Sequence, residues 1–205
     1  MAVLDPLRSS AEFLRKLTPT RLKALGDATV IELVIREIPR ARRRITELEH
    51  NYPSAPTREL AQRLIDEKKS LAGMVGGITG VFGLLSLPAD LLVMVWLELL
   101  LLVDLATLYK ANLKAESQRG ELLDLFARGN GVGPFTRSTP RAVSTVAGFA
   151  LARAGLRTMG RAVPLVAAPV SAWLNNKHIQ RVGDAAIRHY EGFGKARRKS
   201  TEASR

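Results

Sequence analysis

The sequence predicts an all-α protein, a helical bundle built around a central glycine-rich apolar helical hairpin. Residues with high helix propensity dominate every long segment of the 205-residue chain. Alternating polar and apolar runs bounded by hairpin dipeptides, which indicate strands, are missing. One segment, residues 71–109, is almost continuously apolar and forms the centre of the predicted bundle.

Three regions that differ in composition predict the domain organisation. Residues 1–50 are polar and charged, and we expect an N-terminal helical segment there. Residues 51–190 form the main helical domain. Residues 191–205 are basic and lack hydrophobic periodicity, which predicts a disordered tail.

Two breaks divide the helical patterns of the main domain. Residues 51–57 carry two prolines and predict a turn, with Thr57 as the N-cap of a helix over residues 58–69. Residues 129–134 carry three glycines and predict a linker. This stretch follows a helical pattern and lacks Gly-Lys-Ser/Thr, so it does not indicate a phosphate-binding loop.

The first half of the apolar hairpin, from Leu71 to Ala89, is uncharged over a length that just suffices to cross a bilayer. Its glycines recur three and four residues apart, so one helix face allows another backbone to approach closely. We expect a membrane or a protein partner to contact this face and the tryptophan of the second helix. The predicted contact residues are Gly73, Gly76, Gly77, Gly80, Gly83 and Trp96.

Pro88 marks the start of the second hairpin helix, which is apolar nearly all round and is therefore either a core element or a membrane span. Twelve Leu or Val residues between positions 91 and 109 favour membrane insertion by about 4–7 kcal/mol. The carboxylates of Glu98 and Asp104 oppose it by about 5–7 kcal/mol. The two terms cancel, so both interpretations stay open.

Charged residues of the hairpin predict a polar network. The three acidic side chains share an arc of about 120° on the second helix, but their axial separations of about 9–12 Å are too large for one metal ion. Three arginines recur every fourth residue further along the chain, and we expect them to pair with the acidic face. Lipid phosphates or solvent are the alternatives for these arginines. The predicted network comprises Asp90, Glu98, Asp104, Arg153, Arg157 and Arg161.

The formal net charge of +12 predicts attraction to a polyanion, either nucleic acid or the anionic cytoplasmic leaflet. Only 5% of residues are aromatic and none lies among the basic clusters, so specific nucleic-acid binding by base stacking is not indicated. The clusters at residues 40–44 and 195–199 are candidate anchors to anionic lipid. The N-terminal sequence lacks the pattern of a signal peptide, which predicts a cytoplasmic protein.

Catalytic and metal-binding motifs are missing from the sequence. The chain has no cysteine, no Gly-x-Ser-x-Gly elbow and no His-Glu-x-x-His motif. His50, His178 and His189 lie in charged helical surroundings and are interpreted as surface histidines. We therefore expect no cofactor and no metal.

Several segments together resemble the EcsC family over residues 50–190. The similar segments are Tyr52-Pro53, residues 58–65, the glycine run 73–83, residues 87–91 and 104–109, Asn175, and residues 181–187. Lys110 departs from the pattern, because the family commonly has glycine after its tyrosine. The arginine-rich stretch 153–161 departs as well. The resemblance implies a helical protein linked to bacterial ABC-transporter operons and lends no catalytic residues.

These observations predict a non-enzymatic, membrane-associated accessory protein at the cytoplasmic membrane surface. The expected partners are the anionic surface of the inner membrane and a membrane transporter, and the oligomeric state is left open. One alternative is a soluble helical bundle that binds a lipid or another apolar ligand. A second alternative is a metal-dependent hydrolase that uses the hairpin carboxylates.

Overall fold

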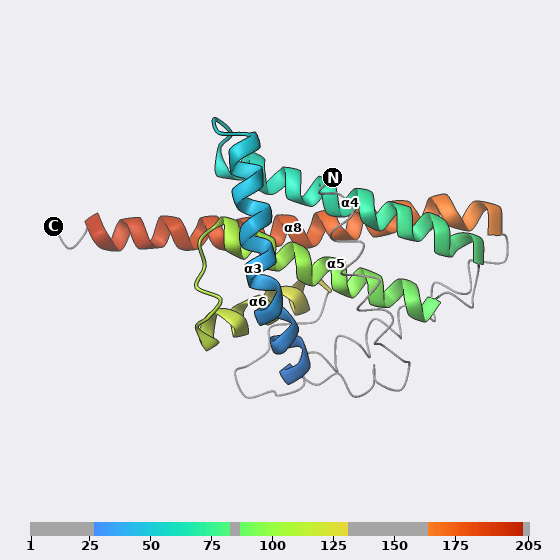
Figure 1. Ribbon diagram of the computed structural model, residues 1–205, viewed down its shortest axis with the longest axis horizontal. Coiled ribbons are helices and arrows are strands. Elements are labelled where there is room, and N and C mark those ends of the chain that lie inside the picture. The colour runs from blue at the N-terminus through green and yellow to red at the C-terminus, as the bar shows by residue number, and fades with distance from the viewer. Residues whose placement is uncertain (1–26, 83–86, 131–163, 203–205) are drawn as a thin grey trace.

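The computed structural model describes residues 27–82, 87–130 and 164–202 of the chain. These residues form five α-helices and no strand, which confirms the predicted all-α class. The helices, shown in Figure 1, are α3 (Asp27–Asn51), α4 (Thr57–Phe82), α5 (Leu87–Leu108), α6 (Glu116–Gly129) and α8 (Pro164–Glu202).

Helix α5 is the centre of the bundle. It packs against α3, α4, α6 and α8, while α3 crosses it on one side and α4 and α8 lie side by side behind it (Figure 1). From Val93 to Leu108 nearly every side chain is buried, because neighbouring helices surround α5. A helix in that position has no polar face, which explains its apolar sequence. Among the described residues, no helix has the length and hydropathy that crossing a membrane requires.

The two halves of the predicted hairpin belong to α4 and α5, which pack against each other. Helix α4 begins at Thr57, one residue before the predicted start, so Thr57 is its first helical residue and not its N-cap: the N–H of Leu60 donates to the carbonyl of Pro56 at 3.1 Å. The helix continues without a break from the charged stretch into the glycine-rich stretch. Helix α5 begins at Leu87, next to Pro88. Residues 83–86 between them lie outside the described residues, so the turn of the hairpin stays a prediction.

The C-terminal tail differs from the expectation. Helix α8 continues through Glu202, so residues 191–202 are helical rather than disordered. The stretch has no hydrophobic periodicity, but Ala, Lys, Arg and Glu all have high helix propensity. Its basic residues also lie at the C-terminal end of a long helix, where the negative end of the macrodipole stabilises positive charge.

The end of α5 explains the departure at Lys110. Lys110 has a φ of 60°, and the N–H groups of Lys110 and Ala111 donate to the carbonyls of Thr107 and Ala106 at 3.0 and 2.8 Å. These two bonds form a Schellman motif, which places its left-handed residue where Lys110 stands and prefers glycine there. Lys110 therefore occupies a backbone position that favours glycine.

Replacing Lys110 by glycine should raise the free energy of unfolding by about 1 kcal/mol, because the strain of a Cβ in the left-handed region disappears. Urea denaturation followed by circular dichroism measures the change. Lys110→Ala is the control, since it removes the charge but keeps the Cβ. Equal effects of the two substitutions would contradict this explanation.

Helices α4 and α8 run antiparallel and approach closely. Arg58 lies near Glu191 at one end of the interface, while Gly73 faces Asn176 further along. At the centre, Gly183 of α8 packs directly against Ile65 of α4, and a Cβ at position 183 would lie 2.5 Å from the Ile65 side chain. Glycine is therefore required at this contact.

Gly183→Ala should lower the free energy of unfolding by about 1–3 kcal/mol, because the added methyl group overpacks the interface. The matched control is Gly192→Ala in the same helix, where nothing lies within 4 Å of the added carbon. That control should stabilise the helix by about 0.5–1 kcal/mol. A thermal melt of both variants tests the prediction, and it fails if Gly183→Ala is neutral.

Candidate functional site

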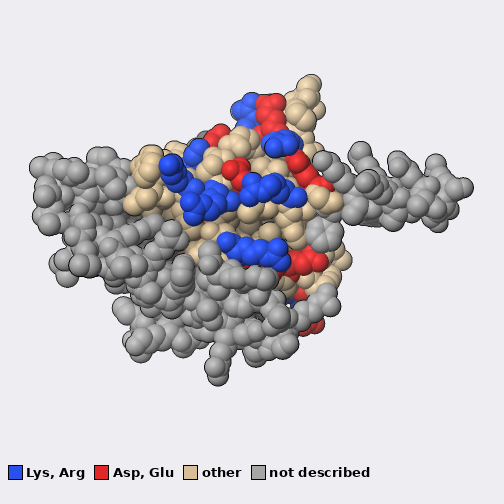
Figure 2. Space-filling model, turned by 180° about the vertical axis from the view of Figure 1, so that it is seen from behind, with Lys and Arg blue, Asp and Glu red and all other residues tan. Residues whose placement is uncertain are grey.

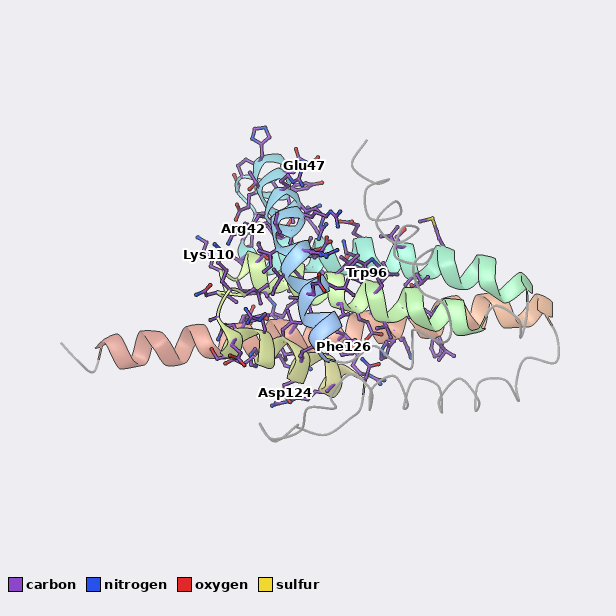
Figure 3. The ribbon with its side chains drawn as sticks, turned by 60° about the horizontal axis from the view of Figure 1, so that its bottom comes forward. Arg42, Glu47, Trp96, Lys110, Asp124 and Phe126 are labelled. Atoms are coloured by element: carbon purple, nitrogen blue, oxygen red, sulfur yellow. The ribbon has the colours of Figure 1, made fainter. Side chains whose placement is uncertain are left out.

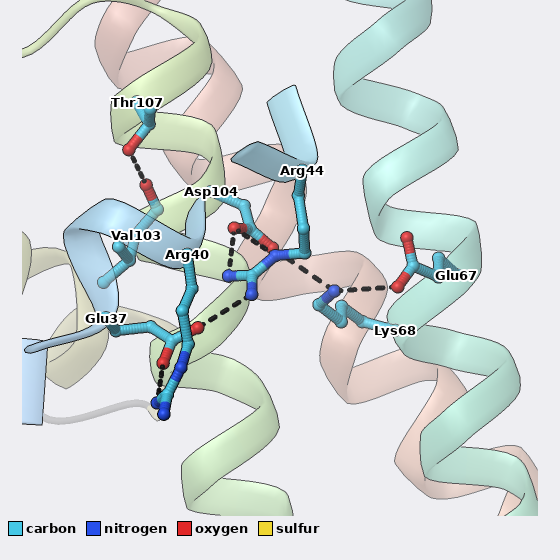
Figure 4. Close-up of polar contacts among 8 residues, drawn as sticks. All are labelled: Glu37, Arg40, Arg44, Glu67, Lys68, Val103, Asp104 and Thr107. Atoms are coloured by element: carbon cyan, nitrogen blue, oxygen red, sulfur yellow. Dashed lines mark hydrogen bonds and ion pairs between the residues drawn. The ribbon is translucent and has the colours of Figure 1, made fainter. Parts of the chain in front are cut away.

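Two carboxylates of α3 and α5 and two cations of α3 and α4 form a buried ionic cluster, shown in Figure 4. Asp104 and Lys68 are both 0% exposed, and Lys68 Nζ lies 3.2 Å from Asp104 Oδ2. Arg44 donates to the other oxygen of Asp104 at 2.6 and 3.0 Å, and to Glu37 at 2.8 Å. The cluster, comprising Glu37, Arg44, Lys68 and Asp104, carries no net charge.

Two partly exposed side chains, Arg40 and Glu67, contact the buried ionic cluster at its edges. Arg40 donates to Glu37 at 3.2 Å, and Lys68 donates to Glu67 at 3.1 Å. Burial alone would lower the pKa of Arg44, but the charges of Asp104 and Glu37 and the hydrogen bonds to both raise it above its ordinary value. The cluster therefore holds its charges by mutual pairing and joins α3, α4 and α5.

Glu98, the second predicted carboxylate, has different partners. Its Oε2 accepts a hydrogen bond of 2.6 Å from the amide of Asn130, and its Oε1 lies 2.7 Å from His178 Nε2. Asn130 also donates to the carbonyl of Phe126 at 2.9 Å. These contacts join α5, the end of α6 and α8. They give the buried carboxylate of Glu98 the hydrogen-bond partners that buried polar groups normally have.

The interpretation of His178 and His189 as surface histidines is wrong. Both side chains are largely buried at helix contacts, whereas His50 is exposed as expected. His178 pairs with Glu98 across the bundle, and His189 lies 3.8 Å from Glu121 of α6. Charged neighbours in the sequence suggested exposure, but both residues lie on the inner face of α8.

His189 and two tyrosines form a further aromatic contact at the middle of the bundle. Tyr109 and Tyr190 stack with ring centroids 5.6 Å apart, and His189 packs edge-on against Tyr190. Burial lowers the pKa of His189 and raises the pKa of Tyr190. Burial, together with Glu191, raises the pKa of Tyr109 to about 12, so these phenols stay neutral.

The remaining predicted network residues lack a described partner. Asp90 lies in α5, but its side chain is outside the described part, and Arg153, Arg157 and Arg161 are outside it altogether. Pairing of these arginines with the acidic face therefore stays a prediction. Within the described ranges no group of three His, Asp or Glu residues is placed to hold a metal ion.

The predicted contact residues divide in a similar way. Trp96 is only 4% exposed and lies among the helices in Figure 3, so it is a core residue and does not face a membrane or partner. Trp96 is buried because α3, α4, α6 and α8 all pack against α5. Gly73 packs against Asn176 of α8. Gly76, Gly77 and Gly80 lie in the second half of α4, and Gly83 is outside the described residues.

Sequence reasoning missed a basic face on α8. Trp173, Lys177, Arg181 and Arg188 share an arc of about 80° on the helix, opposite its buried side. Trp173 is 54% exposed, and Lys177 Nζ lies 4.0 Å from its ring centroid. We call these four residues the α8 basic face. The signal for this face in the sequence is the spacing of four, four and seven residues between its members.

The α8 basic face lies on the side of the bundle away from α3. Figure 2 shows this side, where Lys and Arg side chains lie across the middle with acidic ones among and beside them. On neighbouring α4, Arg63 and Lys69 are paired with Glu59 and Asp66. Lys177, Arg181 and Arg188, in contrast, make no ion pair with any described residue. Within the described part of the chain their charge is not compensated by an ion pair.

Lys68→Met should lower the free energy of unfolding by about 3–5 kcal/mol, because it leaves the buried ionic cluster with an excess negative charge. Adding Asp104→Leu should restore much of the loss, since the remaining Glu37–Arg44 pair is neutral. Arg36→Met, which breaks an exposed pair with Glu32, is the control and should cost under about 1 kcal/mol. Urea denaturation checks all three, and a neutral Lys68→Met would disprove the role of the cluster.

Comparison with known proteins identifies a family for the chain. A model of the EcsC protein family matches residues 22–133, which is more than half of the chain. The match therefore begins within the N-terminal region and includes α3, while the similarity noted in the sequence covered residues 50–190. Comparisons with curated proteins and with solved structures gave no match. The chain belongs to the EcsC protein family.

Proposed function

We propose that this EcsC-family chain is a non-enzymatic accessory protein that binds the anionic surface of the cytoplasmic membrane peripherally, through the α8 basic face. The observation that carries the proposal is the alignment of an exposed tryptophan with three cations that make no ion pair with a described residue, on one face of a long helix. Tryptophan favours the headgroup level of a bilayer, and Lys and Arg favour anionic lipid.

The magnitudes support binding at the surface. Each Lys or Arg near anionic lipid contributes about 1 kcal/mol, so the three cations supply about 3 kcal/mol, a factor of roughly a hundred in affinity. Helix α8 then projects beyond the other helices at its C-terminal end (Figure 1). Its sequence there continues with Lys195 and Lys199 at the same spacing of seven and four residues. We therefore expect each further cation along α8 to add to the attraction to anionic lipid.

The buried ionic cluster supports a peripheral rather than an inserted arrangement for the described part. Its four charges are compensated by neighbouring helices that would have to separate before α5 entered lipid. Leaving Asp104 or Lys68 unpaired in hydrocarbon is costly. A membrane transporter as a second partner, which the family resemblance implies, belongs to this proposal and would meet the protein at the membrane surface.

The test measures co-sedimentation of the full chain with vesicles of phosphatidylcholine containing phosphatidylglycerol. Binding should weaken as salt is added, because the attraction is screened. The variant Lys177→Gln/Arg181→Gln/Arg188→Gln should bind about a hundredfold more weakly.

The matched control, Arg42→Gln/Arg43→Gln/Lys114→Gln, removes the same charge from exposed positions outside α8, and should retain most of the affinity. Equal losses in both variants would show that net charge alone matters and would contradict a binding face on α8. Absence of vesicle binding by the unmodified chain would overturn the proposed function.

A further inference from the structure

A groove of about 630 Å³ lies between the start of α4 and the C-terminal half of α8. Its size is within the range of about 300–1,000 Å³ that is typical of small-molecule sites. Charged side chains of both signs line it, together with an amide and an aliphatic side chain. The lining residues are Pro56, Arg58, Glu59 and Gln62 at the start of α4, and Asp184, Ile187 and Arg188 of α8.

Asp184 and Arg188 face this groove without pairing with each other. They are four residues apart on α8, a spacing at which a carboxylate and a guanidinium commonly form an ion pair. Three other pairs at this spacing do so: Glu32–Arg36, Glu59–Arg63 and Asp124–Arg128. Asp184 instead accepts a hydrogen bond of 3.0 Å from the neutral amide of Gln180. Neither Asp184 nor Arg188 makes an ion pair with a described residue.

Arg58 is a second cation that lines the groove. The Arg58 side chain is 75% exposed, and among the described residues its ion-pair partner is Glu191, at a long distance of 3.4 Å. It lies in the first turn of α4, where the helix dipole adds positive potential. The groove therefore presents two guanidinium groups and two carboxylates. Glu59 is paired with Arg63, whereas Asp184 makes no ion pair with a described residue.

We propose that this groove binds the headgroup of an aminophospholipid, in which a two-carbon chain joins a phosphodiester to a primary ammonium. Arg188, with Arg58, binds the phosphate, since guanidinium groups bind phosphate oxygens with two parallel hydrogen bonds. Asp184 accepts hydrogen bonds from the ammonium. The short link between the two ligand charges fits two side chains one helical turn apart.

This inference rests on the proposed function, because the membrane surface brings the lipid to the groove. Asp184 and Arg188 lie on the same face of α8 as Trp173 and Lys177, so a membrane bound to the α8 basic face also meets the groove. A quaternary ammonium has no N–H to donate, so Asp184 makes the site selective for ethanolamine over choline headgroups.

The experiment compares two sets of vesicles that contain the same fraction of phosphatidylglycerol, with either phosphatidylethanolamine or phosphatidylcholine as the remainder. The full chain should bind the ethanolamine vesicles about tenfold more tightly, the effect of one charge-assisted contact. Asp184→Asn should abolish this preference. It should nevertheless bind the choline vesicles at least as tightly as the unmodified chain, because it has lost a negative charge.

Asp66→Asn is the matched control, since Asp66 is an exposed acid of α4 that does not line the groove. It should keep the ethanolamine preference. A preference that persists in Asp184→Asn would overturn the assignment of the groove, while the proposed membrane binding would stand. Failure to bind either set of vesicles would instead overturn the proposed function.

A soluble headgroup separates recognition of the lipid from an effect of ethanolamine lipids on bilayer packing. Excess glycerophosphoethanolamine should remove the tenfold preference by occupying the groove, and glycerophosphocholine should not. If neither soluble compound changes the preference, the groove does not recognise the headgroup, and the inference is wrong.

Discussion

The pairing of Asp104 with Arg44 and Lys68 is the interaction on which the rest of the structure depends. Helix α5 is almost entirely apolar, yet near its C-terminal end it carries a carboxylate, Asp104, that is 0% exposed. An unpaired charge there would be too costly to bury, so α3 and α4 must deliver their cations to that point. The packing of both helices on α5 is thus fixed by charge as well as by apolar contact.

That constraint also determines where the protein meets its surroundings. Because α5 takes up contacts on all sides, α4 and α8 form the outer layer on the side away from α3. Their close approach at Gly183 holds α8 in one rotation about its axis. Residues 179, 182 and 186 are then buried, and the α8 basic face is turned outward. Close packing inside the bundle and charge outside it are two consequences of the same helix register.

Much of the fold could be predicted from the sequence, because apolar periodicity, Pro88 and Thr57 are local signals. The partners of the polar residues could not be predicted in this way. Periodicity placed Glu98 and Asp104 on one face of a helix, but it contains no information about which residue of a distant helix lies opposite. Arg44, Lys68 and His178 are supplied by three different helices. The misinterpretation of His178 and Trp96 has the same origin, since burial depends on neighbours far along the chain.

The distribution of charge links the fold to the proposed function. The buried ionic cluster sums to zero, so the net charge of +12 belongs to the rest of the chain. Most exposed basic residues of α3 and α4 that face an acid one turn away are paired with it. On α8 the same opportunity exists between Asp184 and Arg188 and is not used. Two opposite charges that are held apart at this spacing suit the zwitterionic headgroup that we propose for the groove.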